Sequence, residues 1–152
     1  MKKLELPLSA RDLIPHRKTM LLIETLLSYD QEVGAGIILG GTKLGTVFAC
    51  EDEKGEGALV EAVVLLEMMA QAYACLRGYE DRLADRPPAM GFLVGVRHFN
   101  CYRQVGVSEE VTIKVATTTV VGDFFIAQAV VEINFETVAE AELKLWLPPQ
   151  EG

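Results

Sequence analysis

The feature that most constrains this 152-residue chain is a nearly uninterrupted apolar segment, AVVLLEMMAQAYACL, from Ala62 to Leu76. Only Glu67 and Gln71 are polar within it. We predict a helix that ends near Gly78, because glycine suits the C-terminal cap of a helix. A helix that is apolar all round has to be buried on every side. The rest of the chain must therefore surround it.

Most of the remaining chain is predicted to form strands. Residues 111–121, VTIKVATTTVV, alternate in polarity and are rich in β-branched side chains. Ser9 is expected to cap a one-turn helix that Pro15 ends, and the polar stretch 50–57 is expected to be an exposed loop. A turn is predicted at 121–123. The predicted strands are 20–29, 33–41, 90–99, 111–121, 124–135 and 139–147.

One apolar helix and several long, mostly antiparallel strands have few packing solutions. A curved antiparallel sheet wrapped around the helix buries its apolar surface, and this is the hot-dog fold, of the α+β class. We expect one hot-dog domain over residues 1–152. The sheet covers only part of the helix, and a monomer would expose a large apolar patch. We therefore predict a homodimer or a higher oligomer.

Composition excludes several classes of protein. The formal net charge is -8 and no cluster of Lys and Arg is present, which argues against binding to nucleic acid or to an anionic membrane surface. The chain has three cysteines, an odd number, without metal-ligand spacing: Cys50, Cys75 and Cys101. This argues against a disulfide framework and against a zinc site. We find no signal peptide, membrane span or cofactor motif. A cytoplasmic protein without metal, flavin or nicotinamide is expected.

Three stretches carry a resemblance to a known family: IPHRKTMLLIE at 14–24, VLLEMMAQ at 64–71 and MGFLVGVRHF at 90–99. They resemble FabZ-type 3-hydroxyacyl-acyl-carrier-protein dehydratases. The third stretch, together with LEMMAQAYA, is closer to the predicted hot-dog dehydratases of aryl polyene-type pathways. The resemblance implies an acyl thioester substrate on the phosphopantetheine of an acyl carrier protein or of coenzyme A. It also implies that a His removes the C2 proton while the helix carboxylate protonates the departing hydroxyl.

The chain departs from the family at one site. The dehydratases carry their catalytic His in a His-Phe-Pro-Gly loop about fourteen residues before the helix Glu. No His lies between Cys50 and Glu67, and Glu53 occupies the corresponding region. Three residues could replace this His as the base: His16, His98 and Glu53. Because His16 matches the family's Pro-His-Arg segment, which is not catalytic, an anchoring role is expected for it.

Glu67 is the main catalytic candidate, because a carboxylate among apolar neighbours costs several kcal/mol unless it is paired. A structural carboxylate that pairs with Arg97 is the alternative. Gln71, one turn later, could orient Glu67. The backbone amides around Leu59 and Val60 are expected to polarise the thioester carbonyl. The residues expected along the acyl tunnel are Gly91, Phe92, Leu93, Val94 and Gly95.

Three functions follow as hypotheses. The first is a dehydratase acting on 3-hydroxyacyl thioesters. The second is a thioesterase that uses Glu67 alone, and the third is a non-catalytic partner subunit of an active dehydratase. Docking of an acidic acyl carrier protein would need a local basic patch, for which the candidates are Arg82, Arg86, Arg97 and Arg103.

Overall fold

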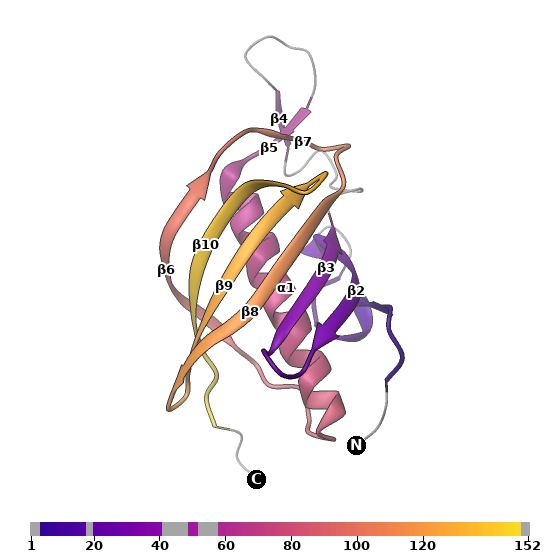
Figure 1. Cartoon of the computed structure of the whole chain (residues 1–152), viewed down its shortest axis with the longest axis vertical. Helices are drawn as coiled ribbons and strands as arrows, with labels where there is room; N and C mark the ends of the chain where they lie inside the picture. The colour runs from indigo at the N-terminus through magenta and orange to yellow at the C-terminus, as the bar shows by residue number, and fades with distance from the viewer. Residues whose placement is uncertain (1–3, 18–19, 41–48, 52–57, 150–152) are drawn as a thin grey trace.

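The structure is a computed structural model that describes residues 4–17, 20–40, 49–51 and 58–149. One long helix, α1 (Ala62–Leu83), lies across the concave face of a seven-stranded antiparallel sheet (Figure 1). The strand order is β1-β2-β3-β8-β9-β10-β6. The strands are β1 (Leu8–Ser9), β2 (Ile23–Asp30), β3 (Ala35–Gly40), β6 (Phe92–Cys101), β8 (Val111–Val121), β9 (Phe124–Ile133) and β10 (Glu136–Trp146).

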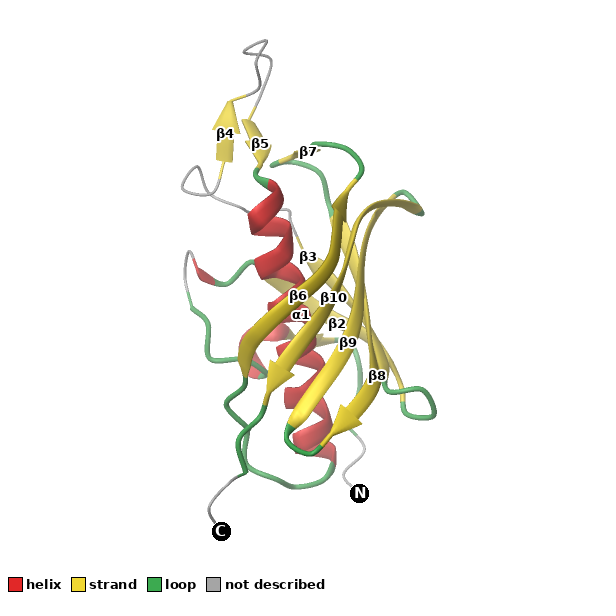
Figure 2. Cartoon of the chain, turned by 90° about the vertical axis from the view of Figure 1, so that its left-hand side faces the viewer, coloured by secondary structure: helices red, strands yellow, loops and turns green. Residues whose placement is uncertain are grey.

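A second, three-stranded sheet lies beside the N-terminal end of α1 (Figure 2). It contains β4 (Ala49–Glu51), β5 (Ala58–Val60) and β7 (Val105–Gly106), with β5 in the centre. A short 3-10 helix, η1 (Ala10–Asp12), precedes β2. The α+β hot-dog architecture expected from the sequence is thus present: a curved sheet wraps around one side of a central helix (Figure 2).

The core forms between α1 and the alternating inner faces of the central strands. On the helix, fully buried side chains recur every three or four residues, as a helix packed on a sheet requires. On β8 the buried residues alternate with partly exposed ones, as expected of a strand covered on one face. The fully buried helix residues are Leu65, Met68, Met69, Ala72, Tyr73, Cys75 and Leu76, and those facing them include Ile113, Ala127, Ala129, Ala141 and Leu143.

The helix does not end near Gly78, as its sequence suggested, but continues to Leu83. Gly78 is needed inside the helix for a different reason. A Cβ atom added there would lie 2.3 Å from the carbonyl oxygen of Leu13, closer than atoms can approach. Glycine therefore lets the N-terminal segment pack directly against the helix backbone.

The sheet of the single chain leaves one side of α1 partly uncovered, as the sequence suggested. Leu66, Glu67, Ala70, Ala74 and Arg77 are only partly buried, and they follow one another at helical spacing along the face away from the sheet. We refer to these five residues as the open face of α1. In the described part of the chain, no helix is long and apolar enough to cross a membrane.

The predicted strand positions agree with the structure to different degrees. The strand predicted at 111–121 has the observed bounds of β8, and the turn at 121–123 is formed with Gly122 at φ +59°. The strands β1, β4, β5 and β7 were not predicted, because two or three residues are too few for a recognisable alternation. Ser9 precedes η1, but its side chain makes no capping hydrogen bond. Residues 50–51 of the predicted loop 50–57 belong instead to β4, and residues 52–57 lie outside the described residues.

Candidate functional site

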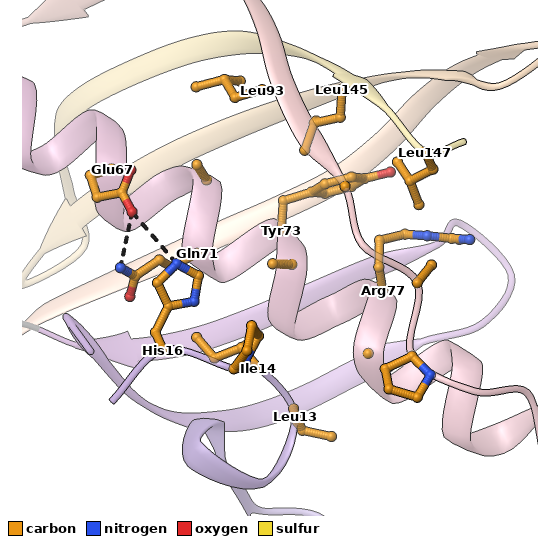
Figure 3. A pocket seen from close by; sticks show the side chains of 17 residues that line it. Leu13, Ile14, His16, Glu67, Gln71, Tyr73, Arg77, Leu93, Leu145 and Leu147 are labelled. Carbon is orange, nitrogen blue, oxygen red and sulfur yellow. Dashed lines mark hydrogen bonds and ion pairs between the residues drawn. The ribbon is translucent and has the colours of Figure 1, made fainter. Parts of the chain in front are cut away.

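A cavity of about 210 Å³ lies over the open face of α1 (Figure 3). Its walls come from α1, from the N-terminal segment 13–16, from residues 88–93 and from the end of β10. Most of the lining is aliphatic. The lining residues are Leu13, Ile14, Pro15, His16, Glu67, Ala70, Gln71, Tyr73, Ala74, Arg77, Gly78, Pro88, Ala89, Gly91, Leu93, Leu145 and Leu147.

Glu67 and His16 face each other in this cavity, and both belong to the same chain. His16 Nε2 lies 3.9 Å from Glu67 Oε1 (Figure 3). The Glu67 side chain is 44% exposed and that of His16 is 31% exposed. The expectation of a carboxylate buried among apolar neighbours is therefore wrong for the single chain, because the site opens to the surface. At this separation an ion pair forms only when His16 is protonated, and no ion pair joins Glu67 to Arg97 in the described structure.

Gln71 fixes the position of Glu67. Its Nε2 donates hydrogen bonds to Glu67 Oε1 at 3.1 Å and to the carbonyl oxygen of Met20 at 2.7 Å. Its Oε1 accepts a hydrogen bond from the backbone N–H of Leu22 at 2.9 Å. Because Gln71 is 1% exposed and bonded at both ends, it joins the helix carboxylate rigidly to the segment that leads into β2. The structure thus gives Gln71 the contact that an orienting residue needs.

The segment that carries His16 is shaped by its neighbour Arg17. Arg17 Nη1 donates to the carbonyl oxygens of Ile14, at 2.6 Å, and His16, at 2.7 Å. His16 Nδ1 is buried and has no hydrogen-bond partner among the described residues. A buried polar atom left unpaired costs about 1–3 kcal/mol.

The remaining candidates divide between this cavity and other places. Gly91 and Leu93 line it, whereas Phe92, Val94 and Gly95 do not. His98 lies on β6 at φ +53°, exposed and outside the cavity lining. It falls where the pairing of β6 with β10 shifts register. Glu53 lies outside the described residues.

The backbone of Leu59 and Val60 belongs to β5, the central strand of the small sheet. Leu59 is paired with Cys50 on one side and with Gly106 on the other, and Val60 is paired with Ala49 and Val105. Neither residue lines the cavity at Glu67. Polarisation of a thioester by these amides therefore stays a prediction.

Several cavity residues were not predicted from the sequence. Ala70 and Ala74 follow Glu67 at successive helical turns, so helical periodicity alone could have placed them on its face. Tyr73 also lines the cavity, and its hydroxyl contacts Thr117 Oγ1 at 2.8 Å. Leu145 and Leu147 come from distant sequence, and no local pattern indicates their position.

The described side chains contain no cluster of three or more metal-ligating groups. Cys75 is buried, and burial raises the pKa of its thiol to about 12, which keeps the thiol protonated at neutral pH. Cys101 is exposed, and its Sγ donates to the carbonyl oxygen of Arg103 at 3.3 Å. His16 and Glu67 are a titratable pair that the structure brings together in the cavity.

Comparison with known proteins gives consistent matches over nearly the whole chain. The sequence model of the ApeP-like family, described as ApeP dehydratase, matches residues 8–151. A 3-hydroxyacyl-[acyl-carrier-protein] dehydratase FabZ from Bacillus cytotoxicus is 30% identical over 139 residues, which are 88% of this chain and 89% of that protein.

Solved structures share the fold at lower identity. The dehydratase heterocomplex ApeI:P from Xenorhabdus doucetiae contains a chain with a TM-score of 0.79 and 16% identity, covering 94% of this chain and 93% of that one. A homologue of HP0420 from Helicobacter felis has a TM-score of 0.65 and 14% identity, with 92% and 88% covered. These structural matches show the hot-dog fold.

Proposed function

The chain belongs to the ApeP-like family of dehydratases, and on that premise we propose that it removes water from 3-hydroxyacyl thioesters with His16 and Glu67 as its acid–base pair. The observation that carries this proposal is the 3.9 Å separation of His16 Nε2 and Glu67 Oε1 in the cavity. The chain has two histidines. One of them, His16, lines the cavity, which makes it the best candidate for the base that the sequence lacks at its usual position.

The proposed reaction is a β-elimination. Neutral His16 Nε2 accepts the proton from C2 of the substrate, and the C2 electron pair forms the C2=C3 double bond. The C3–O bond breaks, and protonated Glu67 gives its proton to the departing hydroxyl, which leaves as water. The pair ends as imidazolium and carboxylate, and transfer of the proton from His16 Nε2 to the Glu67 carboxylate, through one water, restores the starting state.

The apolar walls of the cavity suit the acyl part of the substrate. Leu93, Leu145 and Leu147 lie beyond the polar pair in the same cavity (Figure 3). Burial of aliphatic substrate carbon against them is favourable by about 25 cal/mol per Å². The FabZ relative supports an acyl carrier protein as the carrier of the substrate, and coenzyme A is the alternative carrier.

We further propose that a second hot-dog subunit covers the exposed apolar residues around this site. Phe92, Leu93 and Val94 on the edge strand β6 are all exposed in the single chain, and an exposed apolar edge is a typical interface. The second subunit is a copy of this chain or a homologous dehydratase. The ApeI:P heterocomplex supports the second choice.

The cytoplasm is the proposed location.

Mass spectrometry of 3-hydroxyacyl thioesters incubated with the purified chain tests the proposed reaction. Acyl-carrier-protein and coenzyme A thioesters are compared, and loss of water to give the enoyl thioester is expected. Release of free acid would instead identify a thioesterase. Intact substrate with the chain alone, but faster dehydration when the chain is added to a dehydratase that has the usual His, would identify a non-catalytic partner subunit.

A further inference from the structure

The cavity at the proposed acid–base pair changes its character along its length. Between Glu67 and Arg77 its walls are mostly aliphatic, and they include Leu145 and Leu147 at the end of β10. Arg77 lies ten residues after Glu67 in α1, or about 15 Å along the helix axis. It lines the cavity at the end away from Glu67 (Figure 3). The aliphatic part of the cavity therefore ends at a charged side chain, and we refer to Arg77 in this position as the end wall.

The end wall is held in place by contacts on several sides. Arg77 Nη1 forms an ion pair with Glu80 Oε2, in which the Arg77 side chain is 21% exposed and that of Glu80 is 14% exposed. The guanidinium carbon of Arg77 lies 4.6 Å from the centre of the Phe125 ring, and its Nε is buried. Glu80 also accepts a hydrogen bond from the Tyr29 hydroxyl at 3.1 Å. Because these contacts restrict its rotamers, Arg77 closes the cavity as a fixed group.

The surface beyond the end wall is unsuited to aliphatic carbon. A second cavity, of about 440 Å³, adjoins the first, and Gly78 and Pro88 line both. An alkyl chain in the second cavity would take water from charged groups and offer them no hydrogen bond in return, which is unfavourable. Favourable burial of an acyl chain therefore stops at the end wall. The charged residues that line the second cavity are Arg11, Asp12, Arg17, Asp81, Arg82 and Arg86.

The position of the end wall corresponds to a defined length of acyl chain. A terminal methyl group has to stop about 4 Å short of the guanidinium group, which is the contact distance between heavy atoms. With C3 of the substrate at Glu67, about 11 Å of the 15 Å along the helix then remains for the rest of the chain. An extended chain advances about 3.5 Å for every three bonds, so about nine bonds beyond C3 fit.

We propose that Arg77 sets the upper limit of acyl chain length, and that the substrates are thioesters with acyl groups of up to about twelve carbons. This inference rests on the proposed function, which places the acyl chain along this cavity. It makes Arg77 a specificity-determining residue, because it contacts the far end of the acyl chain and takes no part in proton transfer.

Binding of S-alkyl pantetheine thioethers of increasing alkyl length, measured by calorimetry, tests this limit. These ligands can be neither dehydrated nor hydrolysed. For the native chain, each added methylene group should tighten binding about twofold to fourfold. The gain should end at about twelve carbons, where the alkyl chain reaches the end wall. Affinity that keeps rising well past this length in the native chain would overturn the proposal.

The variant Arg77→Ala removes the end wall. Affinity should then go on rising past the native limit, and the longest ligands should bind about tenfold more tightly than they bind the native chain. The variant Arg77→Ala/Glu80→Gln leaves no unpaired carboxylate and should show the same shift, so it replaces the single variant if that one does not fold. Lys114→Ala is the matched control and should keep the native profile. Lys114 also pairs with a carboxylate, that of Glu132 at 2.8 Å, but lies outside both cavities.

The variant Ala74→Leu tests the same cavity in the opposite direction. Ala74 lines the cavity between Glu67 and Arg77, so a larger side chain should move the limit to shorter ligands. The native profile in either Arg77→Ala or Ala74→Leu, with thermal unfolding showing a folded variant, would overturn the proposal. Because none of these measurements needs turnover, a chain that shows the expected length profile but does not dehydrate would refute the proposed reaction alone.

Discussion

The two faces of α1 have different roles although they belong to one helix. On the face toward the sheet, Leu65, Met68 and Leu76 are at most 1% exposed, and the strands of the same chain cover them completely. On the open face, Glu67 and Arg77 line a cavity and remain partly accessible. The covered face therefore supplies most of the helix's contribution to stability, and the open face carries Glu67, the proposed acid.

Gln71 lies at the boundary between the two faces. It is as buried as the core residues, yet its amide group holds Glu67 and the backbone at Met20 and Leu22. A rigid, fully bonded side chain is thus the connection between the packed core and the site. This arrangement suggests that substitutions on the two faces will separate activity from stability.

The largest effect is expected for Glu67→Gln on the open face. Loss of the acid should lower the rate of dehydration about 10²–10⁴-fold, while the free energy of unfolding changes by less than about 1 kcal/mol. Enoyl thioester formation and urea unfolding are the measurements. The matched control is Glu61→Gln, because Glu61 is an exposed carboxylate at the start of α1, outside the cavity. An unchanged rate in Glu67→Gln would refute the site assignment.

The reverse pattern is expected for Leu76→Ala on the covered face. Loss of a fully buried leucine should lower the free energy of unfolding by about 2–5 kcal/mol. The same change at Leu66, which is only partly buried, should cost less than half as much. Urea denaturation gives both values. Equal losses at the two positions would show that another surface covers the open face in solution, and dissociation into monomers would then accompany unfolding.

Gly78→Ala tests how closely the N-terminal segment packs on the helix. Helix propensity alone would favour alanine by about 1 kcal/mol. The added Cβ, however, would lie 2.3 Å from the Leu13 carbonyl oxygen. We therefore expect a net loss of about 1–3 kcal/mol in unfolding free energy, together with slower dehydration because His16 moves. Gly95→Ala is the control, since its Cβ would lie 3.6 Å from the nearest atom. A stabilised Gly78→Ala variant would contradict this packing.

The smallest effect concerns Tyr29, whose hydroxyl donates to Glu80 Oε1 at 3.1 Å. Burial first, and then the charge of Glu80, raise the pKa of Tyr29 from its ordinary value of 10.0 to about 12. The folded state therefore retains this proton between pH 10 and 12 while the unfolded state loses it. Stability should fall as the pH rises through that range. The variant Tyr29→Phe should lose less stability over this pH range, which thermal unfolding at several pH values measures. The same pH dependence in the native chain and the variant would contradict the prediction.

Much of the fold could be predicted because its signals are local. The start of α1, the bounds of β8 and the turn at Gly122 follow from periodicity and turn chemistry within a few residues. The end of α1 could not be predicted, because Gly78 allows close packing against Leu13, which is distant in the sequence. The sequence indicated that one sheet leaves part of the helix uncovered, but not which face. Which face stays open depends on where the sheet ends.

The site was predicted in part. Glu67 and Gln71 stand out as the two polar residues of an apolar helix, and their spacing of one turn predicted their contact. The proximity of His16 to Glu67 was not predictable from spacing, because it depends on how the N-terminal segment crosses the helix. An anchoring role was expected for His16, and the proposal that it transfers a proton rests on its distance from Glu67.

Hydration of a 2-enoyl thioester in D₂O tests the proposed proton transfer by His16 most directly. The reverse reaction delivers a proton to C2 from the base, so the native chain should place one deuterium at C2 of the 3-hydroxyacyl product, as mass spectrometry detects. His16→Asn should do so about 10²–10⁴-fold more slowly, with its thermal unfolding little changed. Incorporation at the native rate by a folded His16→Asn variant would contradict the assignment of His16 and Glu67 as the acid–base pair.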